Sequence, residues 1–248
     1  EFREACRKYA KDQIEIQKDE FKRLGVLGDW ENPYLTMASK FEADIVRSLG
    51  KIISKGYVNQ GDKPVHWCVD CGSALAEAEV EYEDKISPSI DFSFPIDNKT
   101  VSTIFGQELD LPVFVASWTT TPWTVPGNVA LTVNAEFDYC LVQVTKDLKD
   151  FCLIIGKDLV EGTLERIEVK DFKILGSCKG KKLESVDAKH PYLDRSSKFV
   201  LGDHVTTEVG TGIVHTSPGH GLEDYLVAKE YDLEILSPVK NNGTFNSD

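Results

Sequence analysis

The chain has 248 residues, of which 41% are hydrophobic, and this length is enough to bury a core in one large domain or two smaller ones. Acidic residues outnumber basic residues by 41 to 28, and the formal net charge of −13 disfavours general binding to a phosphate backbone, although it leaves room for a site that admits only the end of a nucleic acid. No apolar run of about 18 residues and no signal peptide occur, so a transmembrane helix is excluded and a cytoplasmic location is expected.

Two helices are expected at the start of the chain. Large side chains recur at helical spacing from Phe2 to Leu24, and Gly25 follows as a stop. A second apolar stripe runs from Phe41 to Ile53 and ends at Gly56. The chain begins at Glu1 rather than Met and stops soon after a turn-like Asn-Asn-Gly, so both ends are expected to be cut.

Beyond residue 63 the pattern changes from helical to extended. Residues 76–83 alternate Ala, Val and Tyr with Glu, which predicts a strand although Ala and Glu favour helix. Two helices are expected, at residues 159–166 and 223–231. Short β-type runs are expected at residues 90–94, 112–117, 139–144, 151–155, 172–175 and 213–215. These elements predict a mainly β domain within an α+β chain from about residue 92 onward.

Cys68 and Cys71 form a CxxC knuckle followed by Gly72, and two thiolates in this spacing fill two corners of a tetrahedral zinc site. No second CxxC occurs, so a pair of free or reversibly oxidised thiols is an equally good interpretation, and zinc would need ligands from outside the chain. The remaining cysteines are expected to be buried free thiols in a reducing compartment; they are Cys6, Cys140, Cys152 and Cys178.

The string WTTTPWTVPGN (residues 118–128) concentrates hydroxyl groups, backbone amides and one side-chain amide on a loop between two tryptophans. Two prolines and a glycine are expected to exclude regular structure there. Such a loop suits a ribose, a carbonyl oxygen or a water molecule. The alternative is that the threonines satisfy turn backbone groups and the tryptophans fill the core.

The string GTGIVHTSPGHGLEDY (residues 210–225) brings His215 from a short strand into a glycine-rich turn, with His220 and Asp224 following. The carboxylates of Glu223 and Asp224 would lie at the amino end of a helix. There, helix capping is the alternative to a binding role. His215 could equally be a satisfied core residue. A metal site from these three residues lacks HExxH-like spacing, and neither a GxSxG elbow nor a Walker loop occurs.

These two strings resemble the editing-site signatures of bacterial-type isoleucyl-tRNA synthetases. Residues 63–82 resemble the zinc-binding entry to that family's inserted domain, and residues 24–37 resemble the catalytic-domain stretch before it. The HIGH and KMSKS motifs are absent, so activation of amino acids is not expected from this chain. Gly127 and Ser217 stand where the family more often has Ala or another small residue.

The resemblance implies a helical piece of a Rossmann-type catalytic domain at residues 1–62, half of a zinc ribbon with a connecting strand at 63–91, and a β-barrel-like editing domain with peripheral helices at 92–248. The implied partner is the acceptor end of tRNA(Ile) carrying misattached valine. The parent enzyme would use ATP and Mg²⁺, could bind Zn²⁺ and would be a monomer.

The resemblance also implies roles for individual residues. Asp224 would hold the α-ammonium of valine, and His215 would close the pocket against isoleucine. Catalysis would fall to Thr119, Thr120 and Asn128, with Thr121, Trp123 and His220 completing the substrate site. The competing hypotheses are a non-catalytic zinc-ribbon module that binds the tRNA acceptor end or a protein partner, and an unrelated metallohydrolase that uses His215 and His220.

Overall fold

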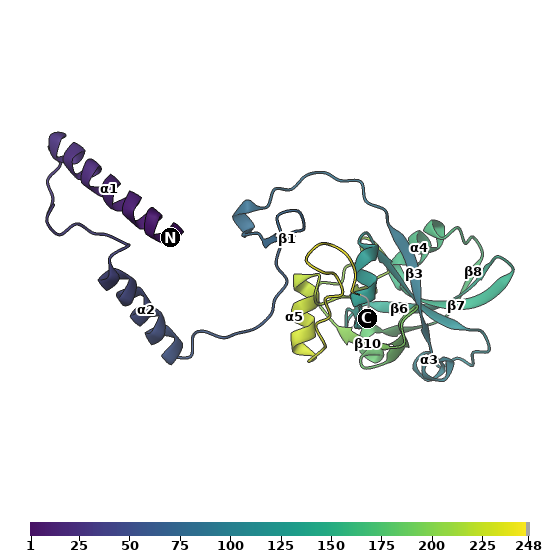
Figure 1. Cartoon of the computed structure of the whole chain (residues 1–248). Helices are drawn as coiled ribbons and strands as arrows, with labels where there is room; N and C mark the ends of the chain where they lie inside the picture. Colours follow the sequence, from purple (N-terminus) through teal and green to yellow (C-terminus); the bar gives the residue numbers. More distant parts are fainter. Residues whose placement is uncertain (247–248) are drawn as a thin grey trace. The chain divides into compact units, whose positions relative to one another are not determined.

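The computed structural model describes residues 1–246 (Figure 1). The chain forms two compact units, with the boundary between Asp62 and Lys63. The first unit contains α1 (Phe2–Arg23) and α2 (Ser39–Ser54), which confirms both expected helices. Arg7 donates a hydrogen bond to the Met37 carbonyl (2.8 Å). Neither helix buries a residue, and Cys6 is exposed, so the prediction that this thiol is buried was wrong.

No helix within residues 1–246 combines the length and the apolar character needed to cross a membrane.

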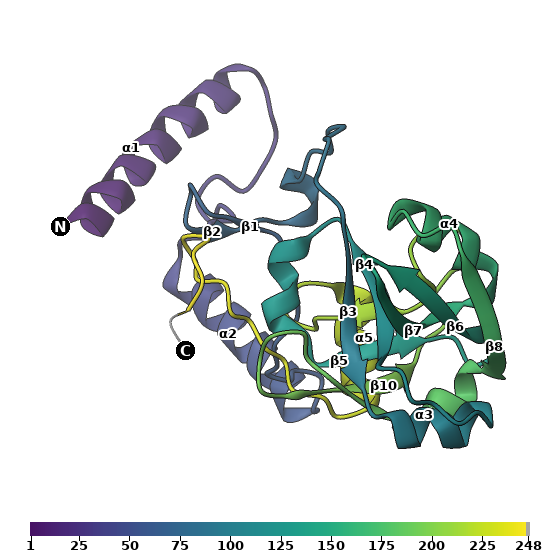
Figure 2. The same ribbon diagram turned by 90° about the vertical axis from the view of Figure 1, so that its right-hand side faces the viewer.

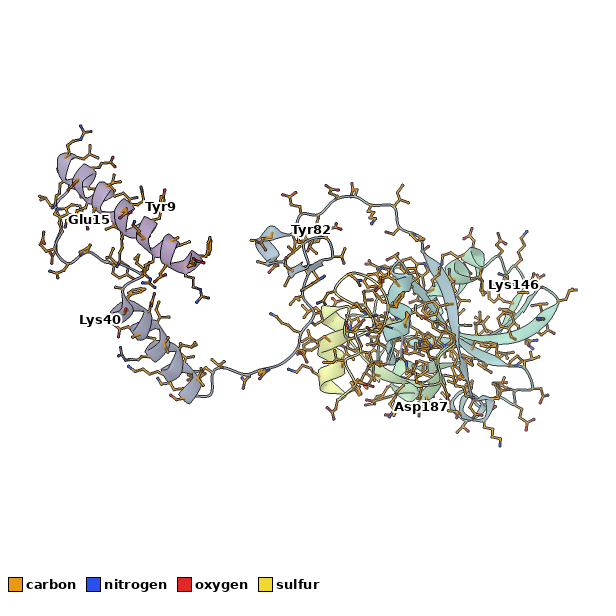
Figure 3. The ribbon with its side chains drawn as sticks, viewed as in Figure 1. Tyr9, Glu15, Lys40, Tyr82, Lys146 and Asp187 are labelled. Atoms are coloured by element: carbon orange, nitrogen blue, oxygen red, sulfur yellow. The ribbon has the colours of Figure 1, made fainter. Side chains whose placement is uncertain are left out.

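The second unit opens with a hairpin of β1 (Trp67–Cys68) and β2 (Ser73–Ala74), followed by the 3-10 helix η1 (Glu77–Glu79). The predicted strand at residues 76–83 was therefore wrong. The Glu79 carboxylate accepts a hydrogen bond from the Ala76 backbone (2.8 Å), and this local bond stabilises the helical turn. Within residues 1–246 no strand pairs with this stretch. Tyr82 is 84% exposed and lies away from the sheet (Figure 3).

Nine strands form one mixed sheet in the order β11-β5-β10-β9-β3-β4-β7-β6-β8, and Figure 2 shows β4, β7, β6 and β8 lying in sequence across it. The pairs β4–β7 and β5–β10 are parallel, and the other pairs are antiparallel. The strands are β3 (Ile90–Ile96), β4 (Val113–Thr119), β5 (Ala130–Val133), β6 (Asp138–Lys146), β7 (Lys149–Gly156), β8 (Phe172–Lys179), β9 (Asp187–Lys189), β10 (Ser196–Leu201) and β11 (Val214–Thr216).

Helical segments connect these strands, and the α+β class is confirmed. The two helices expected late in the chain are present as α4 and α5. The segments are α3 (Asn98–Phe105), η2 (Pro122–Gly127), η3 (Lys157–Leu159), α4 (Val160–Arg166), η4 (Gly180–Leu183) and α5 (Leu222–Glu230). The six expected β-type runs all fall on strands, with shifted boundaries at several ends, whereas α3, β5, β9 and β10 were not predicted.

The sheet is curled like part of a barrel, but backbone hydrogen bonds do not join its two edge strands, β11 and β8, within residues 1–246. Strands β4 and β11 are not neighbours in the sheet order, yet side-chain bonds join β4 to the segment entering β11. Ser117 donates to the Ile213 carbonyl (3.0 Å), and Thr211 donates to the Ala116 carbonyl (2.9 Å). This curl brings the carboxyl end of β4 next to β11.

The core lies on both faces of the curled sheet. One cluster gathers around Phe94, Tyr139 and Phe199, and a second packs α4 against β6 and β7 through Leu164 and Ile155. Cys140, Cys152 and Cys178 are buried free thiols, as predicted, and burial raises the pKa of each.

Candidate functional site

A cavity of about 290 Å³ opens where the end of β4 meets β11 and the start of α5. Its wall combines residues 118–121 with residues 209–215, so the curl of the sheet joins the two strings that were singled out from the sequence. Six of the predicted site residues line it together: Thr119, Thr120, Thr121, His215, His220 and Asp224.

The threonine loop is held by its own hydrogen bonds. The Thr119 hydroxyl accepts from the Thr121 backbone (3.0 Å) and lies 3.2 Å from the Thr121 hydroxyl. The loop then enters η2, so the expectation of irregular structure was wrong: Pro122 occupies the first turn of this 3-10 helix, where a missing N–H costs nothing. Thr120 is exposed at the cavity wall, whereas Thr119 is buried.

His215 is 7% exposed and contacts Thr124 through Nε2 (3.0 Å). The Thr124 hydroxyl has one proton and lies 2.8 Å from the Thr121 carbonyl, which can only accept. The arrangement that satisfies both contacts has Thr124 donating to the carbonyl and accepting from His215 Nε2–H. Burial, followed by the nearby His190 and His220, lowers the pKa of His215 to about 4. His215 is therefore neutral at pH 7.

Asp224 lies in the first turn of α5, as expected, but it does not cap that helix. Its Oδ2 instead accepts from the Ser217 backbone (2.9 Å), in the turn after β11. Burial raises the pKa of Asp224, while the Ser217 hydrogen bond and the nearby His204 oppose this rise. The carboxylate is therefore fixed in position beside the cavity.

Trp123 and Asn128 lie away from the cavity lining. Trp123 is 50% exposed and packs edge-on against His220, with ring centroids 5.3 Å apart. Asn128 is fully buried: its amide donates to the Ala130 carbonyl (2.8 Å), and its oxygen accepts from Ser197 (2.6 Å). The Asn128 side chain thus links η2 to β5 and β10 through buried hydrogen bonds, and its catalytic role stays a prediction.

Unpartnered polar atoms gather at this cavity. Within residues 1–246, six buried side-chain nitrogen or oxygen atoms have no hydrogen-bond partner, and five of them belong to residues that line it. They are Trp118 Nε1, His204 Nε2, His215 Nδ1, Ser217 Oγ and His220 Nε2. Because buried polar groups are normally paired, this concentration indicates a site that a polar ligand or water completes. Trp118, His204 and Ser217 were not among the site residues predicted from the sequence.

The cysteine pair lies in the hairpin, where the Cys71 backbone donates to Cys68 Sγ (3.3 Å). This bond lowers the pKa of Cys68, and the neighbouring Cys68 raises that of Cys71. No group of three or more His, Cys, Asp or Glu side chains that could hold a metal ion occurs within residues 1–246. The pair fits half of a zinc site, and the zinc hypothesis stays a prediction.

The chain belongs to a known class of proteins. The family described as tRNA synthetases class I (I, L, M and V) matches residues 1–215, and the chain is a member of that family.

Within this class, the expected resemblance to isoleucyl-tRNA synthetases is confirmed. The chain is 54% identical over its whole length to an isoleucine–tRNA ligase of Shewanella baltica (strain OS155 / ATCC BAA-1091) and covers 27% of that protein. It is 53% identical over 99% of its length to the isoleucine–tRNA ligase of Yersinia enterocolitica and covers 26% of it. The chain therefore spans about a quarter of the length of these relatives.

Among solved structures, the crystal structure of GlLeuRS-CP1 matches with a TM-score of 0.48 and 16% identity, over 60% of this chain and 66% of the other. The P. knowlesi cytosolic leucyl-tRNA synthetase editing domain also matches with a TM-score of 0.48, at 15% identity, over 57% and 60%. Both likenesses are too low to bear on substrate or mechanism.

Proposed function

We propose that this cavity is an editing site that hydrolyses the ester of valine misattached to tRNA(Ile) and spares isoleucine. The observation that carries the proposal is the gathering of five unpartnered polar atoms around one cavity that also holds the Asp224 carboxylate and the threonine loop. Such a cavity matches a small ligand with an ammonium, an ester and ribose hydroxyls. Sequence similarity to isoleucine–tRNA ligases supports the choice of amino acid.

The need for such a site follows from energetics. A pocket that separates isoleucine from valine by one methylene gains only about 1–3 kcal/mol, a general limit whose familiar illustration is the isoleucyl-tRNA synthetases themselves. A second site must therefore remove the errors. That site admits the smaller side chain and excludes the larger one by steric contact.

Asp224 is the proposed anchor for the α-ammonium. Ser217 N–H occupies Oδ2 and fixes the carboxylate plane, and no hydrogen bond within residues 1–246 occupies Oδ1. An ammonium bound there gains a charge-assisted hydrogen bond. The bound cation also favours the ionised carboxylate that burial alone disfavours.

His215 is the proposed steric limit of the pocket. Its ring is held from one side by Thr124 and packs edge-on against Phe92, with centroids 5.8 Å apart. A ring fixed in this way cannot swing aside for one further methylene. Because His215 is neutral at pH 7, it also adds no repulsion to the ammonium that Asp224 binds.

The proposed reaction is attack of water on the ester carbonyl. The bond from the carbonyl carbon to the ribose oxygen breaks, valine leaves as the free acid, and the ribose oxygen regains a proton that the water releases. Thr119 and Thr120 would orient the carbonyl and the water, and Trp118 Nε1 offers a further N–H donor in the same wall. An aminoacyl ester is already activated, so positioning supplies most of what the reaction needs.

For the whole protein, we infer ligation of isoleucine to tRNA(Ile) with ATP and Mg²⁺ in the cytoplasm, on the strength of the similarity to isoleucine–tRNA ligases. The HIGH and KMSKS motifs are absent from this sequence, so we assign no step of amino-acid activation to its residues.

The test uses the full-length Shewanella baltica relative with its matching stretch replaced by this chain. Asp224→Ala should abolish hydrolysis of valyl-tRNA(Ile), and His215→Ala should let isoleucyl-tRNA(Ile) be hydrolysed as well. Both rates are read as loss of radiolabelled amino acid from the tRNA. Retained valine hydrolysis without Asp224 would remove the anchoring role, and unchanged discrimination without His215 would remove the steric account. Binding of the tRNA acceptor end without any hydrolysis would favour the non-catalytic module instead.

A further inference from the structure

His204 lies in the segment between β10 and β11 and lines the same cavity as Asp224. Its Nε2 atom is buried and has no hydrogen-bond partner within residues 1–246. A buried imidazole nitrogen without a partner loses its hydration without compensation. The position of His204 is therefore explained only in part by the packing of the protein itself.

Gly202 leaves the space that this ring fills. A Cβ atom at position 202 would lie 2.9 Å from His204 Cε1, 3.0 Å from Nδ1 and 2.6 Å from Thr132 Cγ2. These distances are shorter than ordinary carbon contacts, so a side chain here would displace the ring. The backbone thus accommodates the imidazole closely and holds it at the cavity wall.

His204 and Asp224 face the same space without touching. Within residues 1–246, neither a hydrogen bond nor an ion pair joins the two side chains. Since Ser217 occupies Oδ2, the cavity presents Oδ1 of Asp224 and the unpartnered His204 Nε2 as two separate polar positions. Both groups line one cavity, which a small polar ligand with several N–H donors can enter.

An α-ammonium meets this requirement, since it has three N–H donors and a carboxylate oxygen satisfies only one of them. A neutral imidazole with its proton on Nδ1 offers a lone pair at Nε2. The other two imidazoles of the wall are placed differently: His215 is tied to Thr124 through Nε2, and His220 packs against Trp123. Nδ1 of His215 and Nε2 of His220 are also unpartnered, but of these three imidazoles only His204 has neither a side-chain hydrogen bond nor an aromatic contact to its ring within residues 1–246.

We propose that His204 is a second anchor for the α-ammonium of the bound aminoacyl ester, with Nε2 and the Asp224 carboxylate binding it from two sides. This assignment rests on the proposed editing function and names a residue that recognises the amino group. It makes the site selective for α-amino esters over the corresponding α-hydroxy esters, because only the ammonium satisfies both acceptors.

The experiment compares His204→Ala and His204→Gln in the Shewanella baltica ligase that carries this chain. The substrates are valyl-tRNA(Ile) and the same tRNA charged with 2-hydroxy-3-methylbutanoate, in which a hydroxyl replaces the amino group. His204→Ala should lower kcat/KM for the valyl ester by about 10- to 100-fold, mainly through KM, and leave the hydroxy ester unchanged. His204→Gln, whose amide oxygen can accept, should recover part of the loss. His66→Ala, at an exposed histidine outside the cavity, is the matched control.

A loss of equal size on both esters would overturn the proposal, because it would show a structural role for His204. No loss on the valyl ester would overturn it as well. Binding of an adenosine that carries valine through an amide separates this inference from the proposed hydrolysis. If the parent protein binds this analogue and His204→Ala weakens binding at least tenfold, the anchor stands even where hydrolysis is absent. If the parent does not bind it, the anchor and the editing site are both refuted.

Discussion

Lowering the pH should destabilise the second unit through His215. The folded-state pKa is about 4, against an ordinary value of 6.5, because burial disfavours the imidazolium. Between these two values the unfolded chain binds a proton that the folded chain does not. The stabilising contribution is therefore complete above pH 6.5 and is lost as the pH falls to 4.

The full loss is about 3 kcal/mol, which corresponds to roughly 6–12 °C in Tm for a domain of this size. Many carboxylates titrate in the same window, so the measurement compares the parent with His215→Gln by urea and thermal unfolding at several pH values from 7 to 4. The parent should lose about 3 kcal/mol more than the variant over this range.

If the stability curves of the parent and His215→Gln run parallel from pH 7 to 4, His215 is not held neutral by burial, and its proposed role as an uncharged pocket wall fails.

Further predictions concern the supports of the cavity. Thr124→Val removes a hydroxyl that bridges a carbonyl (2.8 Å) and an imidazole (3.0 Å) and should lower stability by about 1–3 kcal/mol. Thr206→Val, at an exposed threonine of the same cavity, should change stability by less than about 0.5 kcal/mol, and equal losses in the two variants would contradict the bridging role. Gly127→Ala places a Cβ 2.5 Å from Ser217 Oγ and should cost about 1–3 kcal/mol. Ser217→Ala should restore part of that loss in a double-mutant cycle, whereas additive effects would show that the two positions do not interact. Asn128→Ala breaks two buried hydrogen bonds and should lower the melting temperature without admitting isoleucine; a changed ratio of valine to isoleucine hydrolysis would place this residue in the pocket.

The Gly127 and Ser217 pair also shows what a single sequence leaves hidden. Each residue was noticed as a small departure from the family pattern, and the two lie far apart along the chain. The structure places them in contact, and the serine hydroxyl lies 2.5 Å from the position that the Cβ of an alanine at 127 would take. The two departures are therefore linked by packing.

Runs of apolar residues predicted the central strands because each such strand is buried against a core on at least one face, as in Val113–Thr119. Residues 76–83 alternate apolar residues with Glu, but no neighbouring strand pairs with them within residues 1–246. The hydrogen bond from the Ala76 backbone to the Glu79 carboxylate stabilises a helical turn there instead. The helix at Asn98–Phe105 was missed although Asp97 caps it and Gly106 ends it in the left-handed region (φ 66°).

The sequence predicted site residues that lie within the two strings. It missed His204, which a third segment of the chain brings to the cavity. Thr119 and Asp224 come from the two strings, which the curl of the sheet brings together. His204 arrives on the loop after β10, a strand that the sequence pattern did not reveal because its Ser and Lys residues break the apolar run. Asn128 was assigned to the site from the family resemblance of its string; its side chain makes two buried hydrogen bonds outside the cavity lining, and its catalytic role stays a prediction.

The central claim is that this cavity hydrolyses the ester of misattached valine. The most direct measurement compares the rates at which valine and isoleucine are lost from tRNA(Ile), using this chain by itself and the Shewanella baltica ligase that carries it. Rapid loss of valine with isoleucine retained, in either protein, is the predicted result. Two folded proteins that leave both esters intact, or that remove both at the same rate, would contradict the claim.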